Sequence, residues 1–260
     1  RQAVIEQDSH AMDYSIQVSP NPEALAQSAA AEFTPLPQSA IENRARFSVA
    51  LAGGSTPEKL YRLLASPPFA GQIDWARVGA YWSDERCVPP DDPQSNYRMA
   101  RLALLKQVPL PPENIHRLQG ELDPRLAAFQ YEEWLRSAFA TSAATGAESP
   151  VASFDLILLG MGEDGHTASL FPHQNAVYED WRWVVAEQIQ KLDTWRLTFT
   201  PPLINAAANV IFLVAGERKA EPLKQVLQGP YQPDLLPAQV VKSTNGRLLW
   251  LVDAAAAALL

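Results

Sequence analysis

The sequence predicts an α/β fold built around a mostly parallel, doubly wound sheet. Short apolar runs of strand type alternate along the chain with segments of helical periodicity, which is the element order of a parallel sheet. The runs that begin at residues 47, 154 and 210 are apolar on both faces, as strands covered by helices on each side must be. With 260 residues, 47% of them hydrophobic, the chain can bury a large core.

Each predicted strand is a short apolar run of residue types that favour strands. The predicted strands are residues 14–18, 47–52, 78–82, 154–159, 183–186, 197–200, 210–214 and 248–252. Helices are predicted where apolar residues recur at helical spacing. They are residues 22–32, 57–64, 96–105, 124–139, 167–171, 201–207, 219–227 and the Ala-rich end 253–260, for which Asp253 is the expected N-cap.

No linker or low-complexity tract interrupts this alternation. A single α/β domain is therefore expected over residues 13–260. Residues 1–12 are expected to be a tail, either disordered or foreign to the natural chain. Residues 141–150, rich in small and polar types, are expected to form a surface loop.

The composition restricts the classes of partner. The formal net charge is −8, which argues against nonspecific nucleic-acid binding because that depends on clustered Lys and Arg. A few local cations can still hold an anionic substrate. No apolar stretch approaches the ~20 residues that span a bilayer, so no membrane association is expected. The one cysteine, Cys87, cannot form an intrachain disulfide, and a cytoplasmic monomer is expected.

Residues 154–172 carry the strongest functional signal. An apolar run ends there in a glycine-rich turn, which presents Asp164 and His166 at the expected start of helix 167–171. Open α/β sheets bind ligands at the carboxyl ends of their strands. A carboxylate and an imidazole separated by one residue are typical parts of a general acid–base site. His166 and Asp164 are therefore candidate catalytic residues.

The same segment also matches a dinucleotide fingerprint. Gly160, Gly162 and Gly165 have the G-x-G-x-x-G spacing, and Glu187 lies about 20 residues downstream. This interpretation ranks second, because the two acidic residues between the glycines would face a pyrophosphate. The histidines of the region lack the spacing of zinc ligands, so no metal is expected.

A second glycine turn suits an anion. Gly53 and Gly54 let a ligand approach the backbone, Ser55 and Thr56 offer hydroxyls, and Pro57 suits a first helical turn. Free N–H groups at such a helix start bind phosphate. The turn lacks the Gly-Lys-Ser/Thr of a nucleotide P-loop. A simple tight turn with an N-cap is an equally good interpretation.

Charged residues mark three further strand boundaries. Asp84 and Arg86 follow one predicted strand, Arg196 precedes a second, and Lys219 follows a third. A guanidinium grips anions through its planar fork, and Asp84 is placed to orient a catalytic group. Taken alone, Asp84 and Arg86 are better interpreted as a surface ion pair, and Arg196 and Lys219 are equally well interpreted as solvated surface charges.

Together the segments resemble the 6-phosphogluconolactonase family, which is related to the glucosamine-6-phosphate deaminases. The matching segments occur in the family's order between residues 53 and 220. They are Gly53-Gly54-Ser55-Thr56-Pro57, Ser83-Asp84-Glu85-Arg86, Ser95-Asn96-Tyr97, the long motif 160–172, Arg196-Leu197-Thr198 and Lys219-Ala220. The resemblance implies a three-layer α/β sandwich and neither a metal nor an organic cofactor.

The resemblance also implies an activity, hydrolysis of 6-phospho-D-glucono-1,5-lactone in the oxidative pentose phosphate pathway. Neutral His166 would deprotonate the water that attacks C1, and Asp164 or Asp84 would orient the imidazole. Backbone N–H groups of a glycine turn would stabilise the oxyanion. The residues implied to bind the phosphate are Gly53, Gly54, Ser55, Thr56, Arg86, Arg196 and Lys219.

Two other functions compete with this one. The family's deaminases place a glutamate five residues after the histidine, and here that position is Phe171. A phenyl ring cannot accept a proton, so the deaminase reaction is disfavoured. A non-catalytic sugar-phosphate sensor would keep the phosphate site but would not need the pair of Asp164 and His166.

Overall fold

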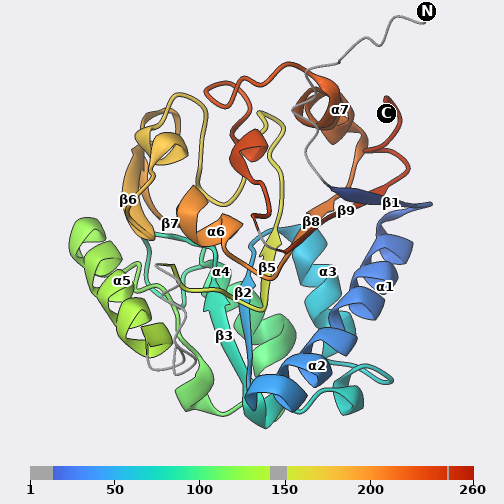
Figure 1. The fold of residues 1–260 in the computed structure, drawn as a ribbon, viewed down its shortest axis with the longest axis vertical. Helices are drawn as coiled ribbons and strands as arrows, with labels where there is room; N and C mark the ends of the chain where they lie inside the picture. Colours follow the sequence, from blue (N-terminus) through green and yellow to red (C-terminus); the bar gives the residue numbers. More distant parts are fainter. Residues whose placement is uncertain (1–13, 141–150, 245) are drawn as a thin grey trace, which may run out of the picture.

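The structure is a computed structural model that describes residues 14–140, 151–244 and 246–260. Its main element is a six-stranded sheet of order β1-β9-β8-β5-β2-β3, with every neighbouring pair parallel. Figure 1 shows the blue N-terminal strand beside the red C-terminal one at one edge. The strands are β1 (Ser15–Ser19), β2 (Phe47–Leu51), β3 (Val78–Trp82), β5 (Leu156–Leu159), β8 (Asn209–Val214) and β9 (Arg247–Asp253).

A smaller antiparallel sheet continues from the end of β3. Its strands are β4 (Asp84–Arg86), β7 (Thr194–Phe199) and β6 (Val184–Ile189), in that order. Ser83 joins the two sheets, because its N–H donates to Leu51 O and its own carbonyl accepts from Phe199 N. The β6–β7 hairpin therefore lies beside the carboxyl ends of β2 and β3.

Helices flank both sheets. Helices α1, α2 and α3 pack against β9, β2 and β8 respectively, and α5 packs against β6 and β7 (Figure 1). The helices are α1 (Pro22–Phe33), α2 (Pro35–Arg44), α3 (Ser55–Leu64), α4 (Asn96–Ala100, continued by a π turn over Arg101–Leu105), α5 (Pro124–Ala140), α6 (Pro201–Asn205) and α7 (Ala220–Gln228). The predicted α/β class with a parallel sheet flanked by helices is confirmed.

The core forms where strands are apolar on both faces. Every residue of β2 and β5 is buried, as the sequence pattern requires for central parallel strands. On neighbouring strands, the rings of Phe212 and Trp250 stack at a centroid distance of 3.7 Å. Burying each such side chain contributes roughly 1.5–3 kcal/mol, so the sheet is a rigid platform for the loops at its carboxyl edge.

Three predicted elements differ from the structure. Residues 167–171 are not helical: Ala168 has φ 47°, and a bridge joins Thr167 to Leu170, so the chain turns back on itself. The end 253–260 forms turns rather than a helix, although the Asp253 carboxylate accepts from Ala256 N. Residues 101–105 continue α4 as a π turn.

The sequence prediction also missed two elements. Helix α2 buries only Pro37 and Ala40 and therefore lacks the apolar stripe by which helices are recognised. Strand β4 consists of three polar residues that pair because β7 lies alongside. The expected tail 1–12 and loop 141–150 fall outside the described residues. Among the described residues, no helix is long and apolar enough to cross a bilayer.

Candidate active site

A cavity of about 710 Å³ lies at the carboxyl edge of the parallel sheet. It brings together loops that follow β2, β3, β5 and β8 and residues of the β6–β7 hairpin, as expected for ligand binding in an open α/β sheet. Its lining residues are Ala52, Gly53, Gly54, Ser83, Asp84, Arg86, Asn96, Gly160, Met161, Gly162, Glu163, Asp164, His166, Ala168, Ser169, Phe171, Lys191, Leu192, Arg196 and Lys219.

The loop after β5 holds the candidate base. Gly162 N donates to His166 O at 2.8 Å, which closes a tight turn between them. Within this turn, His166 Nδ1 lies 2.5 Å from Asp164 Oδ1. A Cβ on Gly162 would lie 2.0 Å from that imidazole nitrogen, so only glycine fits there. The opposite ring nitrogen, Nε2, is left for a ligand.

Two further side chains surround this pair. The ring of Phe171 stacks on the imidazole of His166 at a centroid distance of 4.1 Å. Lys191 forms an ion pair with the second oxygen of Asp164. Burial opposes ionisation of Asp164, but the hydrogen bonds from His166 and Lys191 prevail and hold its pKa well below the usual range. Asp164 is therefore an anion that accepts from both neighbours.

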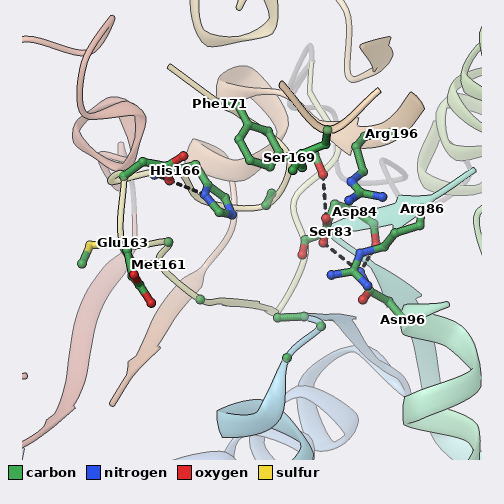
Figure 2. A pocket seen from close by; sticks show the side chains of 18 of the residues that line it. Ser83, Asp84, Arg86, Asn96, Met161, Glu163, His166, Ser169, Phe171 and Arg196 are labelled. Carbon is green, nitrogen blue, oxygen red and sulfur yellow. Dashed lines mark hydrogen bonds and ion pairs between the residues drawn. The ribbon is translucent and has the colours of Figure 1, made fainter. Parts of the chain in front are cut away.

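Asp84 does not contact the imidazole. Its carboxylate is 8% exposed and accepts from Ser169 Oγ at 2.7 Å and from Asn96 Nδ2 at 3.2 Å. Between the two carboxylates considered from sequence, the structure pairs His166 with Asp164. Asp84 lies instead beside the arginines (Figure 2).

Arg86 and Arg196 form a cationic pair across from His166 (Figure 2). They are direct partners in the β4–β7 register, which places both side chains on one face. Burial, and next the charge of Arg86, lower the pKa of Arg196. Arg86 Nη1 donates to Gln94 O at 2.5 Å. Within the part of the chain that the structure describes, Arg86 Nε and Arg196 Nη1 are buried and have no hydrogen-bond partner.

Unpaired buried donors of this kind are costly, so the pair is suited to an anionic ligand.

Glu85 anchors the strand that carries Arg86. Its buried carboxylate accepts from Ser95 Oγ and from the N–H groups of Asn96 and Tyr97, and burial raises its pKa. This ties β4 to the start of α4 and places Asn96 in the cavity.

The first glycine turn reaches the cavity through its backbone. Gly54 has φ 100° and precedes α3 without a side-chain cap, so the helix start keeps free N–H groups. A Cβ on Gly53 would lie 2.0 Å from Asn96 Oδ1. Ser55 and Thr56 lie outside the cavity lining, and the exposed Ser55 is the first residue of α3. The backbone of Gly53 and Gly54 is what this turn contributes to the cavity lining.

Lys219 does line the cavity. Burial lowers its pKa, and the nearby charges of Glu163 and Asp164 oppose that change. Glu163 is exposed and pairs with Arg218 at 3.1 Å. Lys219 is thus a half-buried cation whose charge is available to a ligand in the cavity.

The predicted site residues did not include several that the structure places in the cavity with defined contacts, among them Asn96, Ser169 and Lys191. Asn96 and Ser169 belong to segments that match the family motifs, so these motifs could have identified both residues. No motif contains Lys191, which follows a polar stretch between two strands.

The competing sites are not supported by the geometry. Among residues 14–140, 151–244 and 246–260, no group of three His, Cys, Asp or Glu side chains is arranged for a metal. A dinucleotide fingerprint needs a helix whose start meets the pyrophosphate. The next helical turn after β5 is the short 3₁₀ segment Asn175–Tyr178, well beyond the glycines.

Comparison with known proteins assigns the family. The family model for glucosamine-6-phosphate isomerases/6-phosphogluconolactonase matches residues 20–250. A 6-phosphogluconolactonase of Nostoc sp. is 43% identical over 220 residues, which cover 84% of this chain and 87% of the relative. The 6-phosphogluconolactonase of Haemophilus influenzae is 40% identical over 212 residues, covering 82% and 87%.

Solved structures agree with the fold. The 6-phosphogluconolactonase of Trypanosoma cruzi superimposes with a TM-score of 0.86 at 27% identity, covering 98% of this chain and 99% of the other. A monomeric glucosamine-6-phosphate deaminase is 20% identical with a TM-score of 0.78, covering 95% and 100%. At that identity it shows the fold alone. The extent of these matches shows that the chain belongs to the glucosamine-6-phosphate isomerase/6-phosphogluconolactonase family.

Proposed function

We propose that the protein hydrolyses 6-phospho-D-glucono-1,5-lactone to 6-phospho-D-gluconate. One observation carries this proposal: a single cavity holds an imidazole in contact with a carboxylate and, opposite it, two guanidinium groups with N–H donors that have no partner among the described residues. The names of the relatives from Nostoc sp. and Haemophilus influenzae support the choice of substrate.

The first chemical step needs a base. With Nδ1–H donated to Asp164, the Nε2 lone pair of His166 takes a proton from water. The hydroxide equivalent attacks C1 of the lactone and gives a tetrahedral oxyanion. Backbone N–H groups of the glycine turns that line the cavity stabilise this oxyanion. Asp164 stabilises the imidazolium that has formed.

The second step needs an acid. The bond between C1 and the ring oxygen breaks, and the imidazolium of His166 returns its proton to that oxygen. The products are a carboxylic acid, which ionises, and a free hydroxyl, so one water is consumed and the base is regenerated. One well-placed general base contributes ~10²–10⁴-fold, which is adequate for an activated ester.

The phosphate is bound away from the reacting carbon. Arg86, Arg196 and Lys219 supply the charge and the donors that recognise it, and the backbone of Gly53 and Gly54 lines the same cavity. Binding energy at the phosphate holds C1 near His166 and converts attack by water into an oriented step. Because the arginines are preorganised on paired strands, little side-chain entropy is lost on binding.

The test is a lactonase assay on freshly generated substrate, with the spontaneous rate subtracted. Turnover above that rate is expected for the wild-type protein, with retained 6-phosphogluconate binding and lost turnover in His166→Ala. A protein that binds 6-phosphogluconate but shows no rate above the spontaneous one is a sensor and contradicts the proposal. Robust amine release from glucosamine 6-phosphate would instead assign the deaminase reaction, despite Phe171.

A further inference from the structure

Lys191 reaches the candidate base from a distant part of the chain. It lies on the 3₁₀ turn Gln190–Leu192 between β6 and β7. The turn ends at Asp193, whose φ of 46° places it in the left-handed region, so the hairpin reverses sharply there. The side chain crosses to the loop after β5 and contacts Asp164, which is 27 positions away in the sequence.

The contacts of Lys191 form a closed ring of four side chains. Its ammonium group pairs with Asp164 Oδ2 and lies 5.2 Å from the centroid of the Phe171 ring. Asp164 holds one edge of the His166 imidazole through Oδ1, and Phe171 covers one face of the same imidazole. One cation therefore touches both groups that define the orientation of the imidazole.

This arrangement has two physical consequences. An ion pair and a cation–π contact on one ammonium group restrict Asp164 and Phe171 together, which keeps Nδ1 bound and Nε2 directed into the cavity. A positive charge beside Asp164 also weakens the pull of that carboxylate on an imidazolium.

We propose that Lys191 is a positioning residue for His166, acting through Asp164 and Phe171 rather than through the substrate. The kinetic test of this inference rests on the proposed lactonase function. The test by NMR of the His166 imidazole does not depend on it. The role requires a cation that bridges the Asp164 carboxylate and the Phe171 ring.

A different role is open to any lysine that lines this cavity, namely direct binding of the substrate phosphate. The charged groups beside the Asp164–His166 pair are Lys191 from the hairpin, Lys219 from the segment after β8, and Glu163 with its partner Arg218. Arg86 and Arg196 face the pair from across the cavity. A phosphate-binding lysine would affect KM, whereas a positioning lysine affects kcat and its pH dependence.

The kinetic test compares Lys191→Met with Lys191→Arg over pH 5–9. In Lys191→Met, kcat on the plateau is expected to fall about tenfold with KM within about twofold. The acid limb of kcat/KM is expected to move about 0.5–1 pH unit upward, because a cation at this range no longer opposes the imidazolium. Lys191→Arg keeps both contacts and should restore the limb.

Lys106→Met is the matched control. Lys106 is exposed and lies outside the cavity lining, so this variant should behave as the wild type. If Lys191→Met instead raises KM severalfold and leaves the acid limb in place, Lys191 binds substrate and the positioning role is wrong. Equal thermal unfolding of the three variants shows that the comparison is made between folded proteins.

A second readout does not depend on turnover. Imidazole signals of the free protein, followed by ¹⁵N-edited NMR, report the His166 tautomer and its titration. The Nδ1–H tautomer is expected in the wild type, with a titration midpoint that moves to higher pH in Lys191→Met. If Lys191→Met changes neither the His166 midpoint nor its tautomer, the positioning role is contradicted, whatever the lactonase assay shows. If the midpoint moves but the wild-type protein has no lactonase activity, only the proposed function is contradicted.

Discussion

The two sides of the cavity satisfy their charges in different ways. On the histidine side, formed by His166, Asp164, Lys191 and Phe171, each charged or ring group contacts another of the four. On the arginine side, formed by Arg86 and Arg196, two buried N–H atoms lack a partner in the described part of the chain.

This difference follows from what each side has to do. A general base must be oriented before the substrate arrives, so its partners come from the protein. A group that binds an anion needs N–H donors without a hydrogen-bond partner in the protein, because a donor that already has one gains little binding free energy from a ligand. Substitutions should therefore change the rate on the histidine side and the affinity on the arginine side.

Replacing the base should have the largest effect. His166→Gln removes proton transfer but keeps a side chain that fits between Asp164 and Phe171. We expect kcat for lactone hydrolysis to fall about 10²–10⁴-fold, with 6-phosphogluconate affinity changed less than about threefold. Progress curves and calorimetric titration measure the two quantities. An equal loss of affinity would place His166 in binding and erase the contrast between the two sides.

Crowding the base should have the next largest effect. The added methyl of Gly162→Ala would lie 2.0 Å from His166 Nδ1 and 2.6 Å from Asp164 Oδ1, so the imidazole must shift. A displacement of about 1 Å costs roughly 100-fold in kcat. Gly160→Ala is the control in the same loop, because its methyl would meet nothing within 4 Å. Similar rates for both variants would show that the imidazole orientation is not critical.

Removing an unpartnered cation should weaken binding but not the fold. Arg196→Met is expected to raise KM about 10- to 100-fold, because charge-assisted hydrogen bonds to the anionic substrate are lost. The kcat of this variant should stay within about threefold of the wild-type value. Its free energy of unfolding should rise by about 1 kcal/mol, since an unsatisfied buried donor beside Arg86 is removed. Urea unfolding measures this change.

Arg62→Met serves as the reference for that measurement. Arg62 pairs with Glu58 on the surface of α3, where loss of the pair costs at most about 1 kcal/mol. If Arg196→Met is clearly less stable than Arg62→Met, the N–H donors of Arg196 have hydrogen-bond partners within the protein, and the contrast with the histidine side is lost.

The smallest predicted effect is on the pH dependence of stability. The pKa of Asp164 in the folded protein is depressed by hydrogen bonds from His166 and Lys191, against the opposing effect of burial. In acid the folded state therefore binds fewer protons than the unfolded chain. The contribution of ionised Asp164 to the free energy of unfolding is present above pH ~4 and is lost as pH falls through the folded-state pKa.

Asp164→Asn should accordingly lower the free energy of unfolding by about 1 kcal/mol at pH 5, a figure reduced for partial solvent exposure. The difference from the wild type should shrink steadily as the pH falls from about 4 towards the folded-state pKa of Asp164. Chemical unfolding at several pH values measures it. A difference that stays constant over this range would show that Asp164 is not held ionised by its two neighbours.

Much of the fold could be predicted from local patterns. The apolar runs at β2, β5 and β8 are long enough and regular enough to mark buried parallel strands, and the glycine turns after β2 and β5 mark the loops that form the cavity. The segment 167–171 was mispredicted because the left-handed Ala168 is held by tertiary contacts, among them Ser169 Oγ to Asp84. Strand β4 was missed because only pairing with β7 makes its polar residues a strand.

The sequence alone determined the α/β class, the choice of His166 as the candidate base and the presence of arginines near the carboxyl edge of the sheet, because these depend on residue type and spacing along the chain. The tertiary structure decided that Asp164 rather than Asp84 contacts the His166 imidazole, and that Lys191 completes the histidine side. Contacts between residues far apart in sequence depend on how separate loops pack, and spacing along the chain carries no information about that packing.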